Sequence, residues 1–223
     1  RAAARDIAGT ILADTFQDGG EYKLTADVQT DENIGQVTIT KDTTIDLNGH
    51  TLTISKVGQY FDVHEGAKLT IMDSSDSIQD TESTVTGNVY GNKATLENDT
   101  LTYYITESTA NGTSTTETLV KHEVPLANAG KILCQEASDQ VILVKGTLEL
   151  QSGVLQNTGG QHIFTVDSGT LNMTGGYIVG GGKDGRPGGG IYVDNGEVNI
   201  SGGGIAANRG NSGGGIFVSS GGT

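Results

Sequence analysis

The chain has 223 residues, 35 of them Gly and 2 of them Pro, and its 27 acidic against 13 basic residues give a formal net charge of −14. Such a charge repels phosphate backbones and anionic lipid heads, so nucleic acid is not an expected partner. No apolar run is long enough for a transmembrane helix, so we expect no membrane insertion, and the lone Cys134 excludes an internal disulfide.

Residues 1–20 differ from the rest of the chain. They hold apolar residues at helical spacing and little glycine before Asp18-Gly19-Gly20. Because the open end of a stacked β protein must be covered, we predict an N-terminal cap helix here. A targeting peptide is the alternative, which the acidic Asp6 and Asp14 disfavour.

Residues 21–72 carry short runs in which apolar and polar residues alternate, as in half-buried strands. Gly66-Ala67-Lys68-Leu69-Thr70-Ile71 has the pattern that the C-terminal part later repeats. Residues 73–129 break this pattern. Thr95–Ile105 and Thr116–Val124 predict antiparallel strands joined through Asn111-Gly112, so we expect a β-rich insertion that leaves the stack between two rungs.

Residues 130–223 repeat one motif, centred on glycines at 146, 169, 196 and 221, which are 23, 27 and 25 residues apart. Each copy has room for three short strands, with turns at pairs such as Asn195-Gly196, because glycine tolerates positive φ. Stacked copies bring apolar residues of successive rungs into four inward columns: Ile142, Phe164, Ile191, Ile216; Val144, Val166, Val193, Val218; Leu148, Leu171, Val198; and Leu150, Met173, Ile200. The sequence therefore predicts an all-β, right-handed parallel β-helix.

The last rung stops at Gly221-Gly222-Thr223, where a new strand should begin. We therefore expect 130–223 to be C-terminally incomplete, as in a piece of a longer protein. A bare rung exposes apolar surface and strand edges, so end-to-end self-association is a further expectation.

Two features resemble a known family. The Gly-Gly-Gly-Ile-Tyr-Val and Gly-Gly-Gly-Ile-Phe-Val runs, and the stretch Ile45-Asp46-Leu47-Asn48-Gly49-His50-Thr51-Leu52-Thr53-Ile54, resemble the pectin-lyase-like β-helix superfamily. The likeness is nearest to its non-enzymatic branch of bacterial surface and autotransporter-like proteins. It implies a secreted or cell-surface bacterial protein that presents stacked loops and the insertion to a glycan or a host surface protein. The alternative is a polysaccharide lyase or hydrolase whose active site lies outside this fragment.

Candidate binding residues come from one outward column and one loop. Outward positions of a β-helix should be polar, yet Leu143, Tyr192 and Phe217 follow one another on one face, and such a strip suits a glycan or a protein partner. Aromatic stacking that only stabilises the sheet is the equal alternative. Lys183, Asp184 and Arg186 lie in the longest inter-rung loop, as candidate ligand contacts.

No catalytic group, metal site or cofactor is identified. Asp167 and Asp194 recur in consecutive copies and could approach closely enough for calcium, although both suit ordinary Asp turns better. Asp73 and Asp76 form a second, sparser calcium candidate. His50, His64, His122 and His162 show no metal-ligand spacing.

Overall fold

The computed structural model describes residues 3–86, 93–135 and 140–223. They divide into two compact units, one made of residues up to 76 and from 129 onward, and the other of Ser77–Asn128. The regular elements of these residues are all β-strands, which confirms the all-β class.

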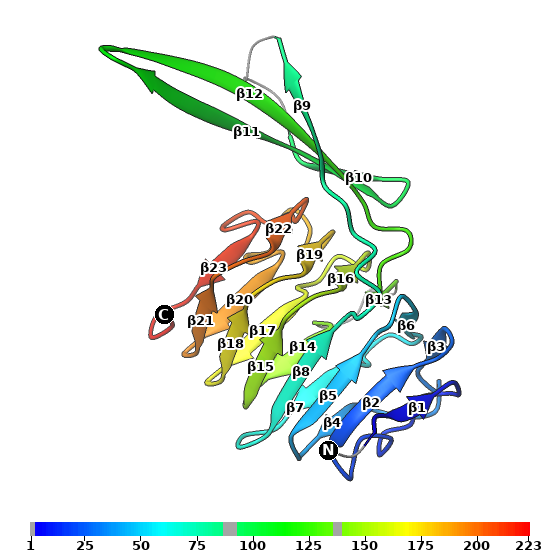
Figure 1. The fold of residues 1–223 in the computed structure, drawn as a ribbon. Helices are drawn as coiled ribbons and strands as arrows, with labels where there is room; N and C mark the ends of the chain where they lie inside the picture. The colour runs from blue at the N-terminus through cyan, green and yellow to red at the C-terminus, as the bar shows by residue number, and fades with distance from the viewer. Residues whose placement is uncertain (1–2, 87–92, 136–139) are drawn as a thin grey trace. The chain divides into compact units, whose positions relative to one another are not determined.

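The larger unit is a parallel β-solenoid, and Figure 1 shows its strands stacked from β1 to β23. Its described strands form three parallel sheets. Sheet I holds β1 Arg5–Ile7, β2 Gly20–Leu24, β5 Thr43–Asp46, β8 Lys68–Met72, β15 Thr147–Leu150, β18 Thr170–Met173 and β21 Glu197–Ile200. Sheet II holds β3 Val28–Gln29, β6 Thr51–Ile54, β13 Lys131–Cys134, β16 Val154–Asn157, β19 Tyr177–Val179 and β22 Gly204–Ala206. Sheet III holds β4 Val37–Ile39, β7 Phe61–Val63, β14 Ile142–Val144, β17 Phe164–Asp167, β20 Ile191–Asp194 and β23 Ile216–Val218.

The predicted inward columns are confirmed by the strand register. Ile142 pairs with Phe164, which pairs with Ile191, and the neighbouring column runs Val144, Val166, Val193. Leu148 and Leu150 lie beside Leu171 and Met173 in the next rung. All of these side chains are buried in one continuous core. Stacking equivalent short strands therefore buries an apolar face that no single rung could bury.

Three of the four motif glycines, Gly146, Gly169 and Gly196, are required by close approach between rungs and not by backbone conformation, whereas Gly221 has a φ of +88°. A Cβ on Gly146 would lie 2.2 Å from the carbonyl oxygens of His64 and Ala67 in the preceding rung. The left-handed conformation falls instead on the residue before the glycine, with φ of 60° at Ser168 and 54° at Asn195. The expected reason for these glycines, tolerance of positive φ, is thus wrong at 169 and 196.

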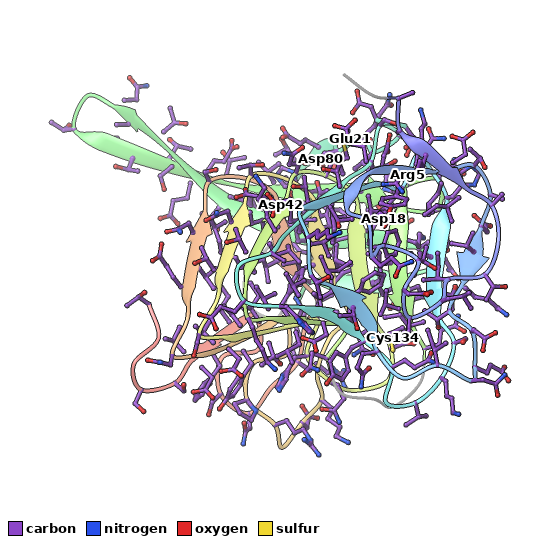
Figure 2. The ribbon with its side chains drawn as sticks, turned by 90° about the horizontal axis from the view of Figure 1, so that it is seen from below. Arg5, Asp18, Glu21, Asp42, Asp80 and Cys134 are labelled. Atoms are coloured by element: carbon purple, nitrogen blue, oxygen red, sulfur yellow. The ribbon has the colours of Figure 1, made fainter. Side chains whose placement is uncertain are left out.

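The N-terminal end of the solenoid is covered, but not by the predicted cap helix. Strand β1 pairs in parallel with β2, and Ile11 and Phe16 are fully buried beyond it. The guanidinium of Arg5 lies over the Tyr22 ring at 4.5 Å and donates to the Gly19 carbonyl. Figure 2 labels Arg5, Asp18 and Glu21 close together at this end. A strand serves better than a helix because it also pairs the free edge of β2.

The C-terminal rung leaves part of the core open. Ile200 pairs with the buried Met173, so it occupies an inward position, yet 45% of its surface is exposed. Val218, beside the buried Val193, is 47% exposed. These side chains are exposed because no described rung follows them, and not because the register has shifted.

The smaller unit is an antiparallel sheet of four described strands in the order β10-β11-β12-β9. Its strands are β9 Thr81–Val85, β10 Thr95–Glu97, β11 Thr100–Asn111 and β12 Ser114–Pro125. The long β11–β12 hairpin is evident in Figure 1 and turns at Gly112, whose φ is +64°. The sequence predicts a β-rich insertion over 73–129, and the four described strands of this unit lie between Thr81 and Pro125.

Candidate functional site

The predicted outward strip lies on sheet III. Leu143, Thr165, Tyr192 and Phe217 are direct neighbours in successive strands, and all four are half-buried. Ile191 and Val193, on either side of Tyr192, are fully buried. The alternation therefore places Tyr192 outward, in the predicted register.

The rings of this strip stack on one another. Tyr192 stacks on Phe217 at 5.4 Å between centroids and on His162 at 5.1 Å, with interplanar angles of 24° and 27°. Both faces of the Tyr192 ring are thus covered by other rings. A sugar that stacks on an aromatic residue needs a free ring face. The Tyr192 ring, in the middle of the strip, therefore exposes only its edge to a ligand.

Sequence reasoning did not include His162 in the strip. Its backbone carbonyl accepts a hydrogen bond from the amide of the buried Asn157 at 3.2 Å, and its Nδ1 contacts the Gly188 carbonyl oxygen. His162 precedes β17 by two residues, so period-two alternation within the strand gave no signal for it. The stacking of aromatic rings across rungs contributes about 0.5–1.5 kcal/mol per pair to folding.

The charged loop reaches the strip at one end. Lys183, Asp184 and Arg186 are exposed, while Gly188 approaches Phe217 so closely that a Cβ there would lie 3.1 Å from the Phe217 Cβ. The loop is held on the next rung by an isolated bridge between Pro187 and Ser212. The structure brings the glycine end of the loop to the strip, with the three charged residues on its exposed part.

Neither acidic pair that was considered for calcium belongs to a group of three close ligands in the described part of the chain. Asp167 and Asp194 are direct neighbours in β17 and β20, as expected. Each accepts a hydrogen bond from a serine, Ser168 at 3.5 Å and Ser219 at 3.2 Å. Each carboxylate of this pair is thus held by a neighbouring serine hydroxyl.

Asp73 is a structural residue at the root of the insertion. Its Oδ2 accepts the Gly130 N–H at 2.7 Å, and its Oδ1 accepts the Gly49 N–H at 2.8 Å and the Ser75 hydroxyl at 2.8 Å. This carboxylate is 7% exposed and bonds to both sides of the insertion. Its oxygens are therefore engaged by hydrogen bonds from the chain itself, which gives this carboxylate a structural role.

An open groove of about 570 Å³ lies on the outer face of sheet I. It is lined by residues of successive rungs: Ala3, Ala4, Glu21, Tyr22, Thr44, Asp46, Thr70, Met72 and Gln151. The lining thus combines two carboxylates, two threonine hydroxyls, one tyrosine and one amide with the side chain of Met72. The groove was missed from sequence because alternation predicts which side chains face outward and not how much space they leave.

The insertion gathers a second polar cluster, around His122. Glu82, His122 and Tyr103 lie directly opposite one another on β9, β12 and β11. His122 Nδ1 is 2.8 Å from Asp80 Oδ2 and 3.7 Å from Glu82 Oε1. The Tyr103 ring stacks on the imidazole at 4.6 Å with an interplanar angle of 3°. Linear spacing gave no hint of this group, because strand pairing assembles it.

The neighbours of His122 along β12 do not join the cluster. Lys121 and Glu123 pair with each other at 2.9 Å, and this hydrogen bond raises the pKa of Lys121. Strand alternation places both on the opposite face of the sheet from His122. The cluster therefore consists of one buried imidazole, two exposed carboxylates and one phenol.

These features define the chain as a parallel β-solenoid with an antiparallel β-insertion. Comparison with models of protein families, with curated proteins and with solved structures finds no match for it. The described residues contain no helix long and apolar enough to cross a membrane.

Proposed function

We propose that the chain is a binding module of a secreted or cell-surface bacterial protein, built on a pectin-lyase-like β-helix, and that it binds an uncharged glycan in the groove on sheet I. The observation that carries the proposal is the groove itself. Its volume of about 570 Å³ is that of a ligand site, and its lining mixes hydrogen-bond donors and acceptors with the apolar side chains of Ala3, Ala4 and Met72.

The chemistry of the groove favours a neutral sugar. Glu21 and Asp46 accept hydrogen bonds from sugar hydroxyls, Thr44 and Thr70 exchange them in both directions, and Met72 covers the apolar C–H face. The same carboxylates, within a chain of net charge −14, repel uronates and phosphorylated glycans. An acidic polysaccharide or a strongly acidic host protein is thus a poor ligand.

The geometry of the groove favours an extended chain. Its lining comes from β2, β5, β8 and the end of β15, which succeed one another at the strand spacing of about 4.8 Å. This spacing is close to the length of one sugar residue in an extended glycan. Because the strands are already hydrogen-bonded in register, binding orders little of the protein, which lowers its entropic cost.

A polysaccharide lyase or hydrolase is the less favoured alternative. Cleavage by a carboxylate pair needs two groups free to exchange protons or attack the sugar. Asp46 Oδ1 already accepts the backbone N–H groups of Asn48 and Ser74, both at 2.9 Å. This carboxylate holds a turn together, so the groove is suited to holding a glycan and not to cutting it.

The test is a binding screen of the chain against neutral β-glucan, mannan, galactan and xylan, with pectate and alginate as acidic comparisons. Thr44→Arg fills the groove and should abolish binding to the neutral ligand. Thr165→Arg is the matched control, since Thr165 is an equally half-buried threonine that faces outward from sheet III. Binding that survives Thr44→Arg but is lost in Thr165→Arg would move the site to the aromatic strip, and release of new reducing ends would favour the enzyme.

A further inference from the structure

The cluster on the insertion has the ligands of a metal site. Among the described residues, Asp80, Glu82 and His122 offer one nitrogen and two carboxylate oxygens that all lie within 4.8 Å of one another. One imidazole with two carboxylates is a ligand set for divalent transition metals, whereas Ca²⁺ and Mg²⁺ prefer oxygen alone. We propose that Asp80, Glu82 and His122 bind a divalent transition-metal ion of the zinc type.

The distances suit such an ion. Tetrahedral ligands about 2.1 Å from Zn²⁺ lie about 3.4 Å from one another. The separations from His122 Nδ1, 2.8 Å to Asp80 and 3.7 Å to Glu82, fall on either side of this value. A shift of roughly half an ångström in each carboxylate opens the site. Both acidic side chains are exposed and can make that shift, and water completes the coordination.

The surroundings of His122 prepare the ligand nitrogen. The residue is 5% exposed, and the stacked Tyr103 ring fixes the plane of the imidazole so that Nδ1 faces the two carboxylates. The Tyr103 hydroxyl also donates to Asp80 Oδ2 at 3.3 Å, which orients the first carboxylate. His122 and Asp80 are therefore oriented before the metal binds, and Glu82 is the ligand that must still be ordered.

The same geometry limits the affinity. A metal on Nδ1 places the imidazole proton on Nε2, which is buried and has no hydrogen-bond partner in the described part of the chain. Metal-ligating histidines normally donate this proton to an outer partner, and losing that partner weakens binding about 10–100-fold. The affinity of this site for metal is therefore moderate, and the site is occupied only where the concentration of free metal is high.

The chain offers matched controls for the ligand set. His64 Nε2 lies 3.3 Å from Asp62, and His50 Nδ1 lies 3.4 Å from Asp27, so each is a histidine–carboxylate pair. Neither pair belongs to a described group of three ligands. If any histidine beside an acid sufficed, these would bind as well.

The experiment is calorimetric titration of the full chain with ZnCl₂, with CaCl₂ as the comparison. We expect one Zn²⁺ per chain and no heat from Ca²⁺. Asp80→Asn with Glu82→Gln should weaken Zn²⁺ binding at least about tenfold, since two of three protein ligands are lost. His64→Ala should leave it unchanged. The two acid variants are exposed and neutralise charge without changing shape, so they keep the test valid even where His122→Ala fails to fold.

Two results would overturn the proposal: the same Zn²⁺ affinity in the double acid variant as in the original chain, or no saturable binding at all.

A second measurement tests which atom of His122 binds the metal. Imidazole nitrogen chemical shifts should report metal on Nδ1 of His122 and a proton on Nε2. The glycan screen does not involve the insertion, so the two proposals stand or fall separately.

Discussion

Replacing Asp73 by Asn should destabilise the solenoid at the corner where the insertion leaves and returns. The asparagine keeps one oxygen, but its NH₂ group replaces the other oxygen and cannot accept a hydrogen bond. The backbone N–H of Gly130 or of Gly49 then faces another donor. The Gly130 amide is buried and would lose its 2.7 Å partner. One buried donor left unsatisfied costs about 1–3 kcal/mol, and the loss of a charge-assisted bond adds about 1 kcal/mol.

A cost of roughly 2–4 kcal/mol lowers the melting temperature by about 4–16 °C in a chain of this size. The assay is thermal unfolding followed by far-ultraviolet circular dichroism. Asp76→Asn is the matched control, because it removes the same charge from an exposed residue three positions on, whose φ of 47° suits asparagine. Equal melting temperatures for the two variants would refute the assignment of Asp73 as the clamp.

Three further changes test the stacking. Gly146→Ala should lower stability by about 1–3 kcal/mol, because its Cβ meets fixed carbonyl oxygens at 2.2 Å; Gly35→Ala, with open space around it, should not, and denaturant unfolding compares them. Tyr192→Ala with Phe217→Ala should lower the melting temperature by removing two ring contacts but should leave glycan binding intact; lost binding would identify the strip as the site. Deleting residues 1–18 should cause aggregation by baring the β2 edge, and a monomeric product in size-exclusion chromatography would contradict this.

The inward columns of the solenoid could be predicted because the same pattern of glycine and apolar residues recurs in several rungs. Leu148, Leu171 and Val198 each follow a motif glycine by two residues, so an error in one copy is corrected by the next. The register in the structure agrees with the sequence at these positions. In a repeat protein the spacing of the motif itself therefore indicates which strands pair and in which register.

The parts that were missed occur once. The first twenty residues have helical spacing, and only the free edge of β2 decides that Arg5–Ile7 is a strand. The cluster at His122 depends on the pairing of β9 with β12, which no local pattern fixes. The groove on sheet I depends on side-chain volumes in different rungs. Tertiary packing determines all three, so one sequence without its structure could not supply them.

The corner at Asp73 has a consequence for how such a chain can change. Strand β13 resumes beside β6 in sheet II as though residues 77–128 had not intervened. The carboxylate ties Gly130 to the turn at Gly49, and Ser77 Oγ donates to the Asn128 carbonyl at 2.8 Å where the excursion closes. Chain of any length that starts and finishes at this spot leaves the rungs in register, and lengthening it adds only a slowly growing entropy of closure. The corner at Asp73 is therefore a position where one inserted sequence can be exchanged for another while the solenoid keeps its fold.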